Sequence, residues 1–131
     1  MQKLIDFSNL HHIAIIASDY QKAKHFYGNI LGLAVIRENH RPDKADIKLD
    51  FALNSTTELE IFVKPTAPVR PNYPEAQGLR HLAFNTEDIV ASVNYLKSQA
   101  VEVEPIRLDD ITQKKMTFFF DPDGLPLELH E

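Results

Sequence analysis

Short runs of alternating apolar and polar residues, together with two stretches of helical periodicity, predict eight strands and two helices. In the first half we expect a helix near residues 20–31 and strands near residues 10–18, 33–38, 46–53 and 58–64. In the second half we expect a helix near residues 89–99 and strands near residues 79–86, 101–104, 114–121 and 125–130. Asp19 and Asp88 precede the two helices, where an N-cap that accepts hydrogen bonds from free N–H groups is favoured.

The pattern of the first half returns in the second half. Residues 10–15, with the sequence LHHIAI, match residues 79–84, LRHLAF, at an offset of 69 residues. Residues 59–61, LEI, match residues 127–129, LEL, at an offset of 68 residues. The repeat therefore predicts an α+β fold that consists of two tandem βαβββ modules.

A proline-rich segment separates the two halves. Four of the ten residues from Pro65 to Pro74 are proline, which is incompatible with a helix interior or a central strand. We therefore expect a stiff linker at residues 65–77. It divides a single domain, residues 1–131, into module one at about 8–64 and module two at about 78–131.

Composition narrows the function. The formal net charge is −5 and Lys and Arg are not clustered, which argues against a nucleic-acid partner. The absence of cysteine excludes disulfides, thiolate metal ligands and a cysteine nucleophile. No apolar run is long enough to span a membrane, and the N-terminal residues do not resemble a signal peptide. We expect a cytoplasmic protein that does not interact with a membrane.

The repeated polar positions are the candidates for chemistry. His12 and His81 occupy equivalent places in the two modules, and so do Glu60 and Glu128. A single histidine or glutamate in a strand is usually explained by solvent on that face. The recurrence of both at matched offsets instead predicts that all four converge on one divalent metal ion. With nitrogen and oxygen ligands and no sulfur, the candidates are Zn²⁺, Ni²⁺, Mn²⁺, Co²⁺ and Fe²⁺.

Other polar residues near these positions are weaker candidates. His11 is expected to point away from His12, and its counterpart in the repeat is Arg80. Glu58 shares a face with Glu60, yet it aligns with a proline. His130 shares a face with Glu128 and is a possible pocket residue. Three basic residues are possible contacts for an anionic substrate, although a solvated face explains most of them: Arg107, Lys114 and Lys115.

The motifs around these residues resemble the vicinal oxygen chelate superfamily, which includes glyoxalase I, bleomycin-resistance proteins and extradiol dioxygenases. The resemblance covers essentially the whole chain, and its clearest parts are HIAI at residues 12–15, HLAF at residues 81–84 and DPDGLPLE at residues 121–128. It implies βαβββ modules whose mixed sheet curves around a metal site. It also implies that His12, Glu60, His81 and Glu128 match the four metal ligands of bacterial glyoxalase I.

This resemblance implies a metal-dependent lyase or isomerase of the lactoylglutathione lyase type. Its substrate would be a small molecule with vicinal oxygens, an α-hydroxycarbonyl or a hemithioacetal, and a metal-stabilised enediolate would form by proton transfer. Glu128 is the first candidate for the base and Glu60 the second. Zn²⁺ or Ni²⁺ is the preferred metal. Phe62, Phe84 and Phe118 are expected to exclude water.

Two other kinds of function stay open. The first is an Fe²⁺ or Mn²⁺ dioxygenase, or a thiol transferase, that uses only two histidines and one glutamate. The second is a non-catalytic protein that binds a small molecule. In each case we expect a homodimer, because the modules leave sheet edges that need partners and related folds close their sheets by dimerising.

Overall fold

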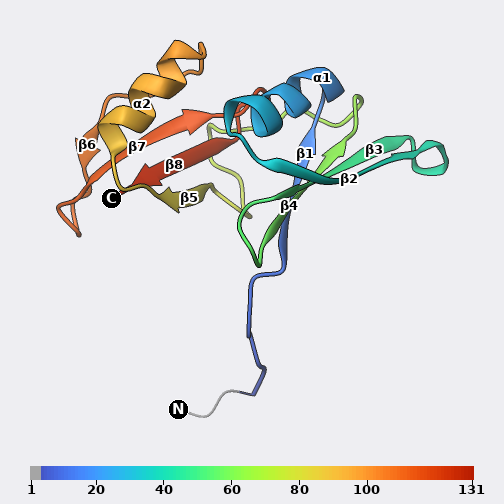
Figure 1. Cartoon of the computed structure of the whole chain (residues 1–131), viewed down its shortest axis with the longest axis horizontal. Helices are drawn as coiled ribbons and strands as arrows, with labels where there is room; N and C mark the ends of the chain where they lie inside the picture. Colours follow the sequence, from blue (N-terminus) through green and yellow to red (C-terminus); the bar gives the residue numbers. More distant parts are fainter. Residues whose placement is uncertain (1–3) are drawn as a thin grey trace. The chain divides into compact units, whose positions relative to one another are not determined.

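The computed structural model describes residues 4–131 and divides the chain into two compact units. The first unit ends at Ala67 and the second runs from Pro68 to Glu131. Each unit follows the order strand, helix and three strands, and each forms one four-stranded mixed sheet (Figure 1). The prediction of an α+β fold with two βαβββ modules is therefore confirmed.

The sheet of the first unit has the strand order β1-β4-β3-β2. Its strands are β1 (His12–Ala17), β2 (Ala34–Arg41), β3 (Asp46–Ala52) and β4 (Glu58–Val63), and a 3-10 turn at Pro42–Lys44 joins β2 to β3. β1 runs parallel to β4, whereas β3 is antiparallel to both β4 and β2. Because side chains alternate along each strand, one face carries buried apolar residues and the other carries the polar ones.

The helix of the first unit covers the apolar face of this sheet. It starts as α1 (Tyr20–Ala23) and continues as a π-helical segment, η1 (Lys24–Ile30). Asp19 is its N-cap, and its side chain accepts a hydrogen bond of 2.8 Å from the Lys22 N–H. Gly28 lies against Phe51, since a Cβ at Gly28 would lie 3.4 Å from the Phe51 ring. The predicted extent of the helix is correct, but the sequence pattern does not predict that its second part is π-helical.

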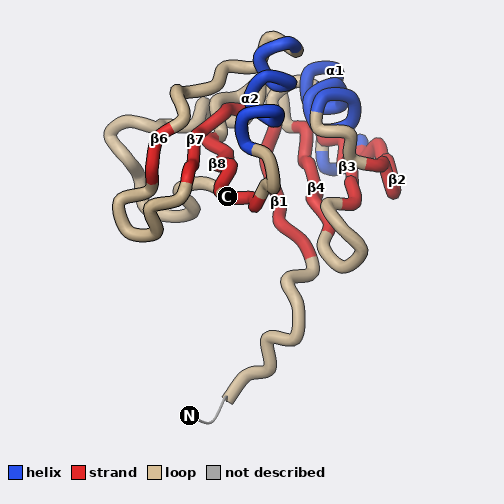
Figure 2. The backbone as a smooth tube through the Cα atoms, turned by 60° about the vertical axis from the view of Figure 1, so that its left-hand side comes forward, coloured by secondary structure: helices blue, strands red, loops and turns tan. Residues whose placement is uncertain are grey.

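The sheet of the second unit has the order β5-β8-β7-β6 and repeats the parallel and antiparallel pairings of the first. Its strands are β5 (Leu82–Asn85), β6 (Arg107–Leu108), β7 (Lys115–Phe120) and β8 (Pro126–His130). The helix α2 (Ile89–Ser98) lies along one face of this sheet and buries Ile89, Val93 and Leu96 (Figures 1 and 2). Its N-cap is Asp88, as predicted, because the side chain accepts a hydrogen bond from the Ala91 N–H.

The turn before β8 is the one that the sequence predicts. Asp121 Oδ1 accepts hydrogen bonds of 2.9 Å from the N–H groups of Asp123 and Leu125. Gly124 has a φ of +83°, which is unfavourable for residues with a side chain. The turn therefore sets where β8, and with it Glu128, begins.

One predicted strand lies elsewhere. The expected strand at 101–104 is not formed; Val103 makes only an isolated bridge to Phe119, and the strand of this part is β6. The physical reason is Pro105, which has no N–H to donate to a neighbouring strand, so regular pairing starts only after it.

The proline-rich segment folds onto the second unit from Pro68 onward. The Arg70 guanidinium donates hydrogen bonds to the carbonyl oxygens of Leu79 and Arg80, and Asn72 Nδ2 donates to the carbonyl oxygen of Gly124. These contacts attach the segment to the residues before β5 and to the turn before β8. It is therefore part of the second unit and not an isolated spacer.

In the part of the chain that the structure describes, no helix has the length and apolar character needed to cross a membrane.

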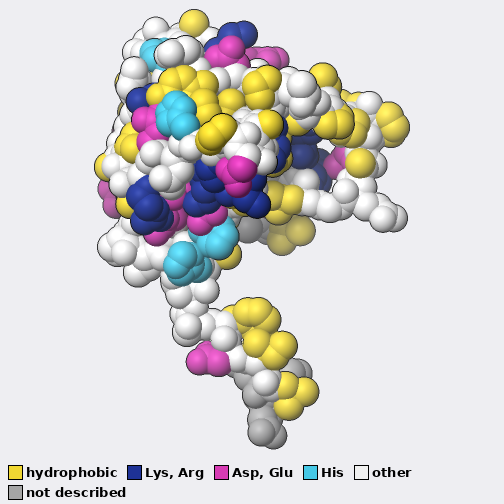
Figure 3. All heavy atoms as spheres, turned by 90° about the vertical axis from the view of Figure 1, so that its right-hand side faces the viewer, with side chains coloured by type: hydrophobic (Ala, Val, Ile, Leu, Met, Phe, Trp, Pro, Cys, Tyr) yellow, Lys and Arg dark blue, Asp and Glu magenta, His cyan; other side chains and the backbone are white. Residues whose placement is uncertain are grey.

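Asp46, at the start of β3, carries a buried carboxylate with two cationic partners. Arg41 donates two hydrogen bonds of 2.7 Å to it, and Lys64 Nζ lies 3.0 Å from its Oδ2. Opposite charges of this kind lie next to one another on the face in Figure 3. The hydrogen bonds from Arg41, followed by those from Lys64, hold the pKa of Asp46 below its usual range despite burial.

We expect Asp46 to make stability depend on pH under acidic conditions. In the unfolded chain its pKa is about 3.9. Because the folded pKa is lower, the stabilisation is fully present above that pH and is lost as the pH falls through the folded pKa. Urea unfolding of the wild type and of Asp46→Asn should therefore give stabilities that differ most near neutral pH, and the difference should shrink progressively as the pH falls below about 4. A difference that is independent of pH would contradict this role.

Candidate functional site

The first histidine–glutamate pair lies on the polar face of the first unit. His12 begins β1, and Glu60 lies on the neighbouring strand β4 opposite Ala14. His12 Nδ1 is 3.5 Å from Glu60 Oε2. The His12 side chain is 43% exposed and that of Glu60 is 13% exposed, so one end of the pair is open to an incoming ion or molecule.

The second pair lies in the second unit. His81 immediately precedes β5, and Glu128 is on the adjacent strand β8. His81 Nε2 is 3.2 Å from Glu128 Oε1, and Glu128 is only 8% exposed. The edge of the His81 ring meets the Phe118 ring with the centroids 5.0 Å apart. The repeat in the sequence therefore corresponds to the same pair of side chains in each unit.

The distances within both pairs fit two ligands of one metal ion. Protein nitrogen and oxygen ligands lie about 2.0–2.2 Å from Zn²⁺. At an angle of 90–109° between them, two such ligands are about 3.0–3.4 Å apart, by simple geometry from the same bond lengths. The observed separations of 3.5 Å and 3.2 Å lie at or close to this range. The residues present therefore fit a divalent cation that is bound through nitrogen and oxygen.

Each unit brings together two of the four predicted ligands. Within residues 4–131 no group of three or more His, Cys, Asp or Glu side chains is arranged to hold a metal. The set of His12, Glu60, His81 and Glu128 on one ion therefore remains a prediction, which rests on the two pairs and on the repeat.

Arg80 determines which nitrogen of His81 carries the proton. Arg80 Nη1 lies 3.2 Å from His81 Nδ1, and a guanidinium can only donate. Nδ1 is therefore the acceptor, and the proton of the neutral ring is on Nε2, facing Glu128. For Nε2 to bind a cation, the ring proton has to move to Nδ1, and Arg80 has to turn away.

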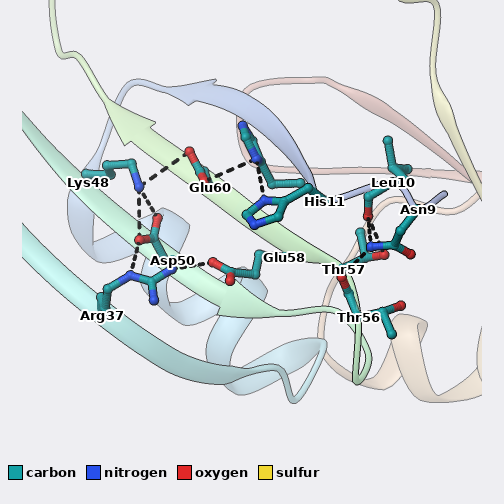
Figure 4. A network of polar contacts seen from close by, with 11 residues as sticks. Asn9, Leu10, His11, Arg37, Lys48, Asp50, Thr56, Thr57, Glu58 and Glu60 are labelled. Atoms are coloured by element: carbon teal, nitrogen blue, oxygen red, sulfur yellow. Dashed lines mark hydrogen bonds and ion pairs between the residues drawn. The ribbon is translucent and has the colours of Figure 1, made fainter. Parts of the chain in front are cut away.

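Glu60 belongs to a network of charges that the sequence reasoning missed. Lys48 Nζ lies 3.4 Å from Glu60 Oε1 and donates hydrogen bonds of 2.8 and 2.9 Å to Asp50, as Figure 4 shows. Arg37 donates a further bond of 2.9 Å to Asp50 and also contacts Glu58. Lys48 and His12 thus occupy both oxygens of Glu60, and binding of a cation by Glu60 requires them to rearrange.

Asp50 anchors this network. Asp50 is 0% exposed, and this burial alone would raise the pKa of its carboxyl. Hydrogen bonds from Lys48 and Arg37 outweigh the effect of burial, so the pKa is lowered. The alternation of Lys48 and Asp50 with buried Leu49 and Phe51 is the sequence signal that places both on the polar face.

The structure contradicts one expectation about the neighbouring residues and gives the contacts of two others. His11 does not point away from His12: their Nδ1 atoms are 2.9 Å apart, because β1 begins only at His12 and strand alternation does not extend to His11. Glu58 pairs with Arg37 and not with a histidine. His130 Nε2 lies 3.6 Å from Asp109 Oδ2.

Of the three phenylalanines expected to exclude water, two lie near the candidate ligands and one does not. Phe118 contacts His81, and Phe62 shares the face of Glu60, beneath the cationic groups of Arg41 and Lys48. Phe84 pairs in register with Leu129, whereas its neighbour Ala83 pairs with Glu128. Phe84 therefore lies on the opposite face from Glu128, and its expected role is wrong.

Comparison with known proteins identifies the family. A family model described as Glyoxalase/Bleomycin resistance protein/Dioxygenase superfamily matches residues 9–129. The chain is 51% identical over 128 residues to the uncharacterized protein YaeR of Escherichia coli (strain K12), covering 98% of this chain and 99% of YaeR. It is 29% identical over 124 residues to the metallothiol transferase FosB of Staphylococcus haemolyticus (strain JCSC1435), covering 92% of this chain and 81% of FosB.

Among solved structures, the crystal structure of the glyoxalase family protein from Enterococcus faecalis has the same fold, with a TM-score of 0.91. The two sequences are 61% identical, and the match covers 95% of this chain and 98% of the other. The family match over nearly the whole length agrees with the duplicated βαβββ plan and with the repeated histidine and glutamate. The chain therefore belongs to the glyoxalase/bleomycin resistance protein/dioxygenase superfamily.

Proposed function

We propose that this protein is a metal-dependent lyase or isomerase of the glyoxalase I type. Its substrate is a small molecule with two vicinal oxygens, such as an α-hydroxycarbonyl or a hemithioacetal. The observation that carries the proposal is the occurrence of the same histidine–glutamate pair in both units, each with a spacing that suits two ligands of one cation.

In this proposal His12, Glu60, His81 and Glu128 hold one divalent ion. Two neutral imidazoles and two carboxylates balance the charge of such an ion, and the absence of sulfur ligands is compatible with Zn²⁺ or Ni²⁺ first, and with Mn²⁺, Co²⁺ or Fe²⁺. The ion would act as a Lewis acid that makes a proton beside a carbonyl easier to remove.

The chain's own residues would carry out the proton transfer. Glu128 is the first choice for the base, because it is buried beside His81, close to the ring of Phe118, which limits water. It would accept the proton from one carbon and return it to the neighbouring carbon. Glu60 is the second choice, since Lys48 already engages one of its oxygens.

A metal determination followed by an isomerisation assay tests the proposal. We expect one divalent ion per chain after purification without chelator, and turnover of a hemithioacetal or a small α-hydroxycarbonyl that disappears on chelation and returns with Zn²⁺ or Ni²⁺. A protein that takes up no stoichiometric metal from any of the five candidate ions would contradict the proposal and favour a non-catalytic binding protein.

A thiol transferase is the second candidate, and the similarity to the metallothiol transferase FosB favours it. Such an enzyme needs two histidines and one glutamate, so Glu60 would be dispensable for metal binding. A dioxygenase of the same superfamily would likewise bind its metal through two histidines and one glutamate. Retention of full metal occupancy by Glu60→Gln, with consumption of a thiol co-substrate, would favour the transferase over the lyase.

We also propose that the chain forms a homodimer. In the first unit the edge strands β1 and β2 carry exposed apolar side chains, including Ile16 at 49%, Val35 at 46% and Ile36 at 41%. Exposed edges with apolar side chains favour pairing with another chain.

Light scattering at micromolar concentration should therefore give the mass of two chains. Substitution of Val35 by lysine places a charge on the edge strand β2 and is expected to raise the monomer fraction if β2 contributes to the interface. A monomeric wild type with metal bound and activity intact would contradict the dimer.

A further inference from the structure

The second unit contains a cavity of about 230 Å³ beside His81. Its wall is built from the segment between Arg70 and Arg80, from Glu104 and Arg107, and from the aromatic side chains of β7. The volume is below the range of about 300–1,000 Å³ that is typical of pockets for drug-sized molecules. The cavity therefore suits a small metabolite, next to one of the two histidine–glutamate pairs.

The charged side chains of the cavity leave a positive excess. Three arginines and two glutamates line it: Arg70, Arg80, Arg107, Glu75 and Glu104. These five side chains together carry one net positive charge. A ligand with a single negative charge would balance it.

Two of the arginines are already neutralised by the two glutamates. Arg80 Nε contacts a carboxylate oxygen of Glu75 at 2.5 Å, and Arg107 Nη1 lies 3.0 Å from Glu104 Oε1. Arg107 also lies over the Phe118 ring, 5.5 Å from its centroid. The positive excess therefore does not come from these two pairs.

Arg70 is the source of the excess. Its Nε donates a bond of 2.7 Å to Asn72 Oδ1, and its Nη2 donates to the carbonyl oxygens of Leu79 and Arg80. All three acceptors are neutral, and no carboxylate of the described residues lies within ion-pair distance of Arg70. The guanidinium is thus held in place with its charge uncompensated and with donor capacity left at Nη1.

Asn72 links the Arg70 guanidinium to the turn before β8. It accepts from Arg70 and donates a bond of 2.7 Å to the carbonyl oxygen of Gly124, in the turn that precedes β8. Arg70 is therefore attached to the same turn that positions Glu128. A guanidinium that is held before the ligand arrives loses less conformational entropy on binding than a free surface side chain.

We propose that Arg70 forms an oxyanion-binding site in this cavity, which accepts the carboxylate or phosphate-type group of a small anionic substrate. The oxyanion lies against the guanidinium, and the apolar part of the molecule lies along the aromatic wall toward His81. The statement that the anion is part of a substrate rests on the proposed function. The binding of an oxyanion at Arg70 does not.

The test uses the full chain, stripped of metal by chelator, in a cationic buffer of low ionic strength. Acetate and inorganic phosphate are titrated separately and followed by NMR at the Arg70 Nε–H and at the backbone amides of Asn72 and Gly124, and acetamide serves as the neutral counterpart of acetate. We expect saturable shifts at these signals with acetate, with phosphate or with both. The anion that binds more tightly identifies the oxyanion, and acetamide should cause no saturable shift.

The matched variants are Arg70→Gln and Lys97→Gln. Each removes one positive charge from the second unit, but Lys97 is on α2 and does not line the cavity. Arg70→Gln should weaken anion binding at least about tenfold, in line with a lost charge-assisted hydrogen bond. Lys97→Gln should change it less than about twofold, because Lys97 is exposed and does not line the cavity, so its charge is screened by solvent. Arg70→Lys, which keeps the charge without the planar fork, should bind with intermediate affinity.

Several results would overturn the inference. These are shifts that do not saturate, acetamide binding as tight as acetate binding, or an equal loss in Arg70→Gln and Lys97→Gln. If Arg70→Gln does not fold, the titration of the wild type decides, because saturable shifts that leave out the Arg70 side chain would also contradict the proposal. Since no metal is present, failure here leaves the proposed lyase untouched, and failure to bind metal leaves this site untouched.

Discussion

Replacing Glu128 with glutamine is expected to lower turnover by a factor of about 10²–10⁴, the usual contribution of a positioned general base. This factor corresponds to about 3–5 kcal/mol of activation free energy. Glutamine keeps the size of the side chain and one carbonyl oxygen, but it cannot accept a proton. Because Glu128 is buried beside His81, bulk water has little access to replace it as the base.

The measurement is kcat in metal-replete protein, with the metal content determined on the same preparation and with a substrate that the wild type turns over. Glu60→Gln is the matched control: the residue type and strand position are the same, but Lys48 already holds one of its oxygens. We expect a milder loss from it. Near-wild-type turnover of metal-replete Glu128→Gln would show that this glutamate is not the base.

Replacing His12 with alanine is expected to remove most of the bound metal while the fold persists. Loss of a partner that only supports a ligand costs about 10–100-fold in metal affinity, so loss of a ligand should cost at least as much. The His12 side chain is 43% exposed and contributes little to the core, which is why the fold should survive.

Metal content after dialysis against a chelator, together with circular dichroism, measures both effects. His25→Ala is the control, since His25 is an exposed histidine on the helix whose side chain contacts Asn29. It should retain one ion per chain. Full stoichiometric metal in His12→Ala after the same dialysis would exclude His12 as a ligand.

The location of the histidine–glutamate pairs could be predicted from the sequence because the relevant information is local. In a strand, every second side chain lies on the same face, so His12 and Glu60 had to lie on the polar face once their apolar neighbours were buried. The repeat predicts that Glu128 lies at the equivalent position of the second sheet. Membership of the superfamily, which the motifs implied, is confirmed by the family match over residues 9–129.

Local periodicity does not locate the ends of strands, and the expectations that depended on those ends are wrong. His11 was expected to point away from His12, but it lies before the strand begins and approaches its neighbour instead. Pro105 displaced a predicted strand to Arg107–Leu108, where the side chain of Arg107 reaches the cavity of the second unit. Such errors arise because periodicity fixes the face of a residue only within the limits of the strand itself.

The sequence by itself determined the order of the elements, the repetition of the βαβββ plan and the residue types at equivalent positions of the two modules. These features depend on periodicity and local capping. Only the tertiary structure decided that Lys48 contacts a carboxylate oxygen of Glu60, and that Arg70, beside the cavity next to His81, has no carboxylate partner among residues 4–131. The first contact depends on the register between β3 and β4, and the second on the path of a proline-rich segment back onto β8. Register and loop path are set by pairings between residues far apart in the chain, which no local pattern encodes.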